Sequence, residues 1–282
     1  MFGGVTKMLS GYLRTTDDAS IYYEIEGEGQ PLVLVHGWAC SSKFWQKNIP
    51  VLKKHFKVVT LDLRGHGKSS KGLHGCLINR IAQDVRELIL SLDLKNVILM
   101  GWSMGGPTML SYWKQFKNDS KLAGLGLIDM TPFPLSSGDW NSHGFRNYNT
   151  EAFNTMISAM NNNQESFVNG FVKKIFKGSR QPEGTEWVNV ECMKAPTATA
   201  LAFYSDYIYS DFTDVLGTIT IPVIVFSSDS NIFPNSIKQG QYIASQIPNA
   251  EFVPFNEGGH MLFYIEAEKF NKSVITFAEH IK

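Results

Sequence analysis

The pentapeptide Gly101–Gly105, with Ser103 at its centre, constrains the fold of this chain more than any other stretch. An apolar run, Asn96–Met100, precedes it, and a segment with helical character, Pro107–Phe116, follows it. A strand, a tight glycine turn and a helix in this order hold a serine on a strained bend, with its hydroxyl exposed at the end of a sheet. The glycines leave room where side chains would collide with the neighbouring strand and helix. The pattern therefore predicts a nucleophilic serine at the carboxyl end of a buried strand.

The same alternation of strand and helix continues along most of the chain. Wholly apolar runs such as Leu32–Val35 are typical of strands that are covered on both faces. Alternating strands and helices favour a mostly parallel central sheet flanked by helices. The expected strands are Leu9–Thr15, Ile21–Glu26, Leu32–Val35, Lys57–Leu61, 97–100, Leu122–Ile128, Ile221–Phe226 and Glu251–Pro254, and the expected helices are Lys43–Lys53, Leu77–Leu92, Pro107–Phe116, Ser236–Gln246 and Ile265–His280.

The alternation stops at Thr131. From Pro132 to Asp211 there is no clear strand, and the helical stretches Glu151–Met160 and Glu165–Phe176 are separated by polar loops. We expect an α/β core formed by residues 1–131 and 212–282, and a helical cap, residues 132–211, inserted into it.

Composition excludes several classes of partner. The 282 residues include 26 Lys and Arg and 26 Asp and Glu, so the formal net charge is zero and no nucleic acid or anionic membrane partner is expected. The apolar runs are far shorter than the roughly 20 residues of a membrane span. The first residues, Met1–Val5, lack the features of a secretory signal, and three scattered cysteines indicate a reducing compartment, so we expect a cytoplasmic protein. The histidines have no metal-ligand spacing, so we expect neither a metal nor a cofactor.

Four motifs together carry a resemblance to a known family. They are His36-Gly37-Trp38 after the third expected strand, the loop Asp62–Ser69, the elbow around Ser103, and Gly259-His260 after the last strand. In this respect the chain resembles the α/β-hydrolase superfamily. Within it the chain is most similar to small capped carboxylesterases, such as the pimeloyl-acyl-carrier-protein methyl ester esterases and the haloperoxidase-like group. The resemblance implies an α/β-hydrolase fold and covers the chain outside the cap.

The candidate general base is His260. A serine hydroxyl is a poor nucleophile unless a base takes its proton during attack. His260 lies in a glycine-rich loop after the last expected strand and comes last in the order nucleophile, acid, histidine. His36 and His66 are better placed to orient the loops in which they lie. The remaining histidines are expected to be solvated or to line a pocket: His55, His74, His143 and His280.

Acyl transfer also needs two donors for the developing oxyanion. One donor should be the backbone N–H of Met104, which follows the nucleophile. The resemblance implies that the N–H of Trp38 is the other, and the Trp38 indole is expected to form a pocket wall beside Trp102 and Met104. Cys40 is not favoured as a nucleophile, because Ser103 occupies the elbow. The aromatic residues that could line the pocket from the cap are Phe133, Trp140, Phe145, Phe203, Tyr204 and Tyr207.

The acid of the triad has two candidates. Most members of the resembled family carry an aspartate after the strand equivalent to Ile221–Phe226, four residues before a proline. Here Pro234 sets that register and the matching residue is Ser230, whereas Asp229 lies one residue early. The alternative is Asp129, at the end of the preceding strand, an arrangement similar to that of some haloalkane dehalogenases. We favour Asp129, because catalytic groups of open α/β sheets lie at strand carboxyl ends and a buried carboxylate needs a hydrogen-bond partner.

Together these residues predict a serine hydrolase that cleaves a carboxylic ester of a small or medium acyl group through an acyl-enzyme. The expected partner is a small-molecule ester, or an ester bound to an acyl carrier. A lactonase, a perhydrolase or a C–C bond hydrolase would use the same groups. A small-molecule receptor on the same fold, in which turnover is incidental, is an alternative from another class.

Overall fold

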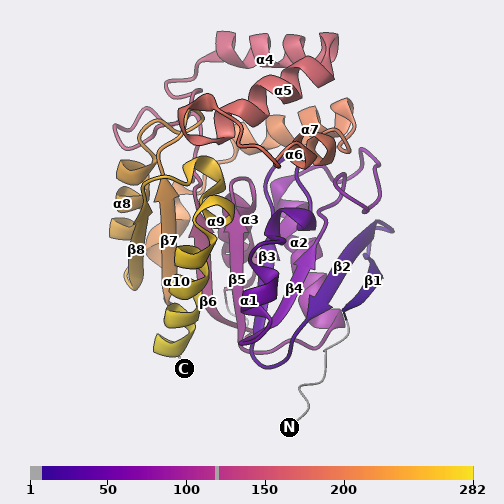
Figure 1. Ribbon diagram of the computed structural model, residues 1–282, viewed down its shortest axis with the longest axis vertical. Helices are drawn as coiled ribbons and strands as arrows, with labels where there is room; N and C mark the ends of the chain where they lie inside the picture. Colours follow the sequence, from indigo (N-terminus) through magenta and orange to yellow (C-terminus); the bar gives the residue numbers. More distant parts are fainter. Residues whose placement is uncertain (1–7, 118–120, 282) are drawn as a thin grey trace.

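One eight-stranded sheet forms the centre of the computed structural model, which describes residues 8–117 and 121–281 (Figure 1). Its strand order is β1-β2-β4-β3-β5-β6-β7-β8; the pairs β1–β2 and β2–β4 are antiparallel and all the others are parallel. The predicted α/β fold with a mostly parallel sheet is therefore confirmed. The strands are β1 (Leu9–Arg14), β2 (Ser20–Glu26), β3 (Pro31–Val35), β4 (Lys57–Leu61), β5 (Val97–Trp102), β6 (Leu122–Ile128), β7 (Val223–Ser228) and β8 (Ala250–Phe255).

The parallel register brings three loops together at one edge of the sheet. Val35 at the end of β3 pairs with Gly101 of β5, and Trp102 pairs with Ile128 at the end of β6. All residues of β3 and β5 are buried, because helices cover both faces of the sheet. The residues that follow these strands, at positions 36, 103 and 129, are consequently neighbours.

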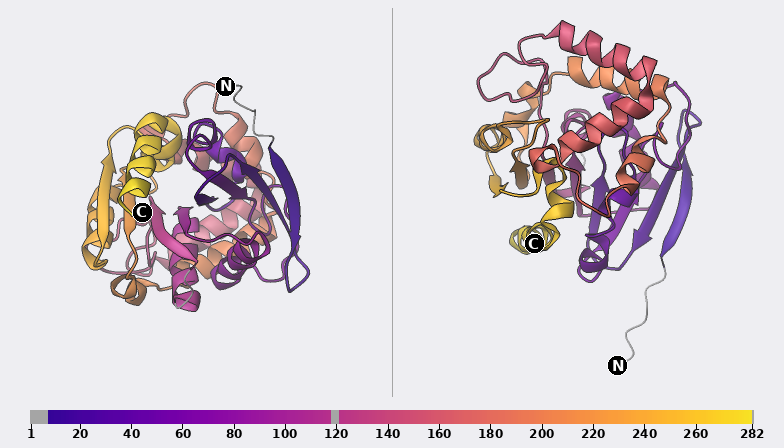
Figure 2. Two further views of the ribbon diagram at one scale, coloured as in Figure 1. Left: turned by 90° about the horizontal axis from the view of Figure 1, so that it is seen from below. Right: turned by 45° about the horizontal axis from the view of Figure 1, so that its top comes forward.

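Helices lie on both faces of the sheet, with α1 and α10 on one face and α2, α3 and α8 on the other (Figure 2). The core helices are α1 (Ile49–Leu52), α2 (Ile78–Ser91), α3 (Gly105–Phe116), α8 (Ser236–Gln246), α9 (Leu262–Ile265) and α10 (Ala267–His280), and the 3₁₀ turns are η1 (Ser42–Trp45), η2 (Lys177–Ser179), η3 (Thr213–Thr218) and η4 (Gly259–Met261).

Four further helices occupy the segment for which the sequence predicts a cap. They lie between β6 and β7 and above the carboxyl ends of the strands, where Figure 1 draws them at the top. Two of them match the expected helical stretches, whereas the other two were not predicted. The helices are α4 (Thr150–Asn162), α5 (Gln164–Ile175), α6 (Trp187–Cys192) and α7 (Thr197–Tyr209).

Two predicted helices are each divided in the structure. The expected helix Lys43–Lys53 is instead η1 followed by α1. Pro50 lies in the first turn of α1, where a missing N–H is tolerated, and the buried Asn48 before α1 donates hydrogen bonds to Phe263 O and Asn271 Oδ1. The last expected helix breaks at Glu266, whose carboxylate accepts a hydrogen bond from the Glu257 N–H.

Within the described ranges, none of the helices combines the length and apolarity that crossing a membrane requires. The stretch Met1–Val5, for which we expect no secretory signal, lies outside the described residues.

Candidate active site

Ser103 lies on the sharp turn between β5 and α3. Its φ is +55°, a left-handed backbone conformation that is uncommon for a residue with a side chain. The turn is so tight that a Cβ at Gly101 would lie 2.1 Å from Gly105 O, and a Cβ at Gly105 would lie 2.7 Å from Val35 O. Helix α3 begins at Gly105, two residues before the predicted start at Pro107, so the serine lies immediately before the helix amino terminus.

His260 comes to Ser103 from a distant part of the chain. Its Nε2 lies 2.9 Å from Ser103 Oγ. The Trp102 indole Nε1–H donates a hydrogen bond of 2.8 Å to His260 O and so fixes the backbone of this turn. Trp102 was expected at a pocket wall, but its ring packs inward against Phe44 and Phe263, and it therefore supports the histidine instead.

Asp129 immediately follows β6 and completes the hydrogen-bonded line. Its Oδ2 lies 2.5 Å from His260 Nδ1, and its Oδ1 accepts hydrogen bonds from the Ser228 N–H and the Ser236 hydroxyl. A carboxylate can only accept, so the proton is on Nδ1 and Nε2 is left to accept the hydroxyl proton of Ser103. This geometry allows proton transfer from serine to histidine, with the carboxylate orienting the ring.

The alternative acid lies elsewhere. Asp229 Oδ1 accepts a hydrogen bond of 3.0 Å from the Ile237 N–H in the first turn of α8, where an acidic side chain is favourable. The Ser230 hydroxyl accepts a hydrogen bond from the Phe233 N–H. In the described structure, neither residue makes a hydrogen bond or an ion pair with His260. Ser228 and Ser236, which hold Asp129, were missed by sequence reasoning, because serines after a strand and at the start of a helix are ordinary in loops.

Two backbone amides beside Ser103 are available to a ligand. A Cβ at Gly37 would lie 2.8 Å from Ser103 Cβ, so the loop after β3 runs directly against the serine. In the part of the chain that the structure describes, the N–H groups of Trp38 and Met104 have no hydrogen-bond acceptor. The Trp38 indole Nε1–H donates to Ala200 O in α7, which joins this loop to the four-helix segment.

His36 holds the same loop as a neutral imidazole. Its Nδ1–H donates to Gly37 O at 2.8 Å, and its Nε2 accepts from the Leu63 N–H at 3.0 Å. Burial lowers the pKa of His36 to about 4, and burial together with the neighbouring His36 lowers the pKa of His66 to about 3. Both histidines therefore position loops, as the sequence predicts.

These buried histidines make stability depend on pH. His36, His66 and His143 have folded-state pKa values of about 4, 3 and 3, below the ordinary value of 6.5. Below about pH 6.5, these histidines therefore become protonated in the unfolded chain but stay neutral in the folded protein. As the pH falls from 6.5 towards the folded-state pKa values, each histidine lowers the free energy of unfolding by about 1.4 kcal/mol per pH unit.

We expect urea unfolding to show a steep loss of stability between pH 6.5 and pH 5, above the range in which carboxylates titrate. The exposed His55→Gln variant should show the same slope, because its histidine lies outside the buried set. A constant free energy of unfolding across this interval would contradict the assignment of neutral buried histidines.

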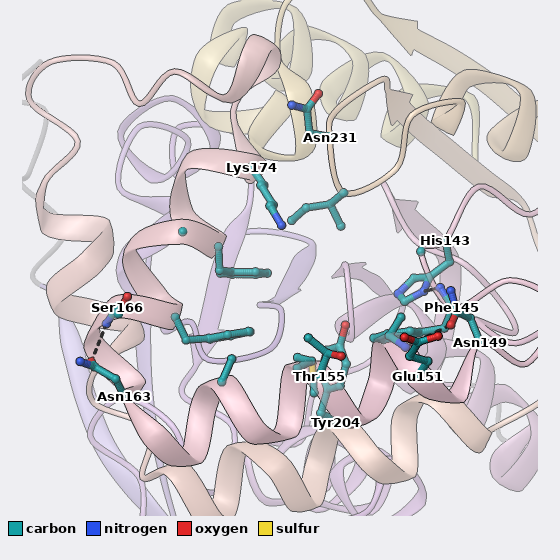
Figure 3. A pocket seen from close by; sticks show the side chains of 18 residues that line it. His143, Phe145, Asn149, Glu151, Thr155, Asn163, Ser166, Lys174, Tyr204 and Asn231 are labelled. Carbon is teal, nitrogen blue, oxygen red and sulfur yellow. Dashed lines mark hydrogen bonds between the residues drawn. The ribbon is translucent and has the colours of Figure 1, made fainter.

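A pocket of about 890 Å³ lies within the four-helix segment, between α4, α5 and the loop before them (Figure 3). Ser103 and His260 are not among its lining residues, but one aromatic ring lies between the pocket lining and His260. Phe233 contacts the rings of His143 and His260, at 5.3 and 5.1 Å between centroids. Its lining residues include His143, Phe145, Phe167, Phe171, Lys174 and Tyr204.

The predicted pocket aromatics separate into two groups. Phe145 and Tyr204 line the pocket, and Trp38 packs on Tyr204 at 4.9 Å. Trp140 does not line it and instead stacks on Tyr242 of α8, at 4.5 Å with an interplanar angle of 1°. Phe203 lies against His66 at 5.4 Å.

Comparison with known proteins agrees with this architecture. Residues 30–267 match the family described as alpha/beta hydrolase fold, and the chain therefore belongs to the α/β-hydrolase family.

Among its relatives, the chain is 27% identical to the bifunctional esterase/perhydrolase of Acinetobacter calcoaceticus, over 95% of this chain and 99% of that protein. It is 26% identical to the pimeloyl-[acyl-carrier protein] methyl ester esterase of Vibrio cholerae, over 92% of this chain and 98% of that protein. Among solved structures, a bromoperoxidase from Bacillus anthracis superposes with a TM-score of 0.88 at 25% identity, covering 96% of this chain and all of the other. The family and its relatives identify a hydrolase.

Proposed function

We propose that the protein is a serine hydrolase that cleaves carboxylic esters of small or medium acyl groups. The observation that carries this proposal is the hydrogen-bonded line from Ser103 Oγ to His260 Nε2, at 2.9 Å, and from His260 Nδ1 to Asp129 Oδ2, at 2.5 Å. The names of the esterase relatives support an ester as the substrate.

In the proposed reaction, His260 takes the hydroxyl proton of Ser103 as the serine attacks the ester carbonyl. The negative charge that develops on the carbonyl oxygen is stabilised by the N–H groups of Trp38 and Met104, which have no acceptor in the described structure. His260 then protonates the leaving alcohol. In the second half, His260 activates water to hydrolyse the acyl-enzyme, and Ser103 recovers its proton.

Hydrolysis of p-nitrophenyl acetate, butyrate and hexanoate by the purified protein tests this proposal. Release of p-nitrophenol above the rate in buffer, with saturation at increasing substrate, is the expected result. Binding of these esters without turnover would favour a small-molecule receptor instead, and turnover of lactones alone would favour a lactonase.

We further propose that the helical segment 132–211 forms the roof of the substrate site and selects the acyl chain. Phe145 lines the pocket, whereas Trp140 is stacked on α8 outside it, so the two aromatics form a matched pair. We expect Phe145→Ala to change the ratio of kcat/KM between butyrate and hexanoate esters by about tenfold, since a buried phenyl ring contributes a few kcal/mol of contact.

The Trp140→Ala variant should leave that ratio within about twofold of the wild-type value, because the contact it removes is with Tyr242. Steady-state kinetics with the ester series measures both ratios. Equal effects of the two substitutions would show that the pocket does not select the acyl chain.

A further inference from the structure

His143 has a polar group that no part of the described protein uses. Its side chain is 6% exposed, and its Nδ1 accepts a hydrogen bond of 3.2 Å from the Phe145 N–H. A ring nitrogen that accepts carries no hydrogen, so the imidazole is neutral and its proton is on Nε2. Among the described residues, no acceptor receives this Nε2–H, although His143 lines the pocket (Figure 3).

Tyr204 is the second polar group at this end of the pocket. It lines the same cavity, and its hydroxyl has no hydrogen-bond partner in the described structure. Tyr204 and His143 share two neighbours: Phe145 lies 5.9 and 5.0 Å from their rings, and Tyr207 lies 5.9 and 6.0 Å from them. The two donors therefore line the same cavity and share aromatic neighbours, one of which, Tyr207, also has a buried hydroxyl without a partner in the described structure.

The position of this pair relates it to the proposed reaction centre. Tyr204 packs on Trp38, one of the two residues with a free amide beside Ser103. His143 is separated from His260 by the single ring of Phe233. In the proposed reaction, a substrate whose carbonyl is bound at Ser103 and whose acyl chain enters this pocket passes these donors.

The chemistry of the pair favours an uncharged acceptor. A neutral imidazole N–H and a phenol O–H each donate one hydrogen bond, and a ketone oxygen has two lone pairs to receive them. An anionic group would find no cation in this pair, because the lysine of the pocket lining, Lys174, belongs to α5 and not to the pair. Burial, Tyr204 and then the charge of Asp129 raise the pKa of the Tyr207 phenol, so a further negative charge beside Tyr207 is disfavoured.

We propose that His143 and Tyr204 form a recognition site for a ketone oxygen on the acyl chain of the substrate. The inference rests on the proposed function and names its substrate class: esters of oxo-acids. Burying a polar donor without a partner is costly, so a plain acyl chain that covers the pair should bind less tightly than one that satisfies it.

The test measures binding and turnover separately. Binding is measured on the Ser103→Ala variant by quenching of tryptophan fluorescence, with methyl hexanoate and with methyl oxohexanoates that carry the ketone at successive carbons. We expect one ketone position to bind about tenfold more tightly than methyl hexanoate. Equal affinities for all of these esters, or no binding of any, would overturn the proposal.

Two further substitutions in the same background separate recognition from support of the loop. In His143→Asn, the side-chain carbonyl can take the place of Nδ1 and keep the Phe145 hydrogen bond, but the donor at Nε2 is lost. In His143→Gln, the amide reaches the position of Nε2 and keeps a donor. The ratio of the affinities for the ketone ester and for methyl hexanoate should fall to nearly one in His143→Asn. It should fall several-fold in Tyr204→Phe and be retained in part in His143→Gln.

A matched control is His55→Asn, which changes an exposed histidine outside the pocket and should retain the full preference. If His143→Asn kept the full preference for the ketone ester, the proposal would be overturned, because His143 would then only support the loop through its hydrogen bond with Phe145. Hydrolysis of the same esters by the unsubstituted protein reports on the proposed function independently. Tighter binding of a ketone ester without hydrolysis would reject the esterase and retain the recognition site. Hydrolysis without tighter binding of any ketone ester would retain the esterase and reject the recognition site.

Discussion

Ser103→Ala is expected to lower kcat for p-nitrophenyl butyrate by on the order of 10⁶-fold, the loss found when a serine hydrolase triad that acts as a unit loses its nucleophile. The hydroxyl lies 2.9 Å from His260 Nε2 and makes no hydrogen bond that holds another element in place. The substitution should therefore leave the midpoint of thermal unfolding nearly unchanged. Initial rates and a thermal melt, both on the purified variant, measure the two effects.

The control for this prediction is Ser91→Ala, which removes an exposed hydroxyl near the end of α2 and should retain wild-type activity. Activity of Ser103→Ala within tenfold of the wild-type rate would remove Ser103 from the reaction. A variant that unfolds would be replaced by Ser103→Gly, which suits the left-handed backbone at this position.

Asp129→Asn is expected to lower kcat by on the order of 10⁴-fold, as loss of the orienting acid does in serine hydrolases. An amide NH₂ facing His260 would donate to Nδ1, and the ring proton would then be on Nε2. A protonated Nε2 could no longer accept the hydroxyl proton of Ser103. Asp229→Asn is the matched substitution, and it should lower kcat by less than about twofold, because the hydrogen bond of Asp229 in the described structure is to the first turn of α8.

The two variants are compared at saturating substrate, with circular dichroism to confirm that each is folded. Asp129 also accepts hydrogen bonds from Ser228 and Ser236, so Asp129→Asn should in addition lower the free energy of unfolding by about 1 to 3 kcal/mol. The reverse ranking of the two variants in kcat would transfer the role of the acid to Asp229 and leave Ser103 and His260 in place.

The sequence predicts the sheet and the elbow well because their signals are local. The strand Lys57–Leu61 and the strand Leu122–Ile128 have the predicted bounds, since each is a short apolar run between turn residues. The predicted helix Lys43–Lys53 is divided partly at a local signal, Pro50, and partly for a reason that is not local. Asn48 is held by residues more than two hundred positions away, and no pattern near it indicates these partners.

Some residues of the candidate site could be predicted from the sequence and others could not. Ser103 and His260 lie in glycine-rich motifs, whereas the choice between Asp129 and Asp229 depends on which side chain reaches the ring of His260, and sequence spacing cannot decide this. For His143, the sequence predicts only a solvated position or a place in a pocket lining. Its neutral tautomer depends on one hydrogen bond to Phe145, and its burial depends on rings from α7 and from the loop after β7, which only the folded chain brings together.

The activated serine is tested most directly by covalent labelling with a fluorophosphonate, followed by peptide mass spectrometry. Because the proposed triad activates Ser103 alone, we expect one adduct per chain, located on Ser103, with esterase activity lost in proportion to labelling. Prior replacement of Ser103 by alanine should abolish the adduct. Full esterase activity after exhaustive treatment, or an adduct on any other residue that accounts for the loss, would contradict a serine mechanism at this site.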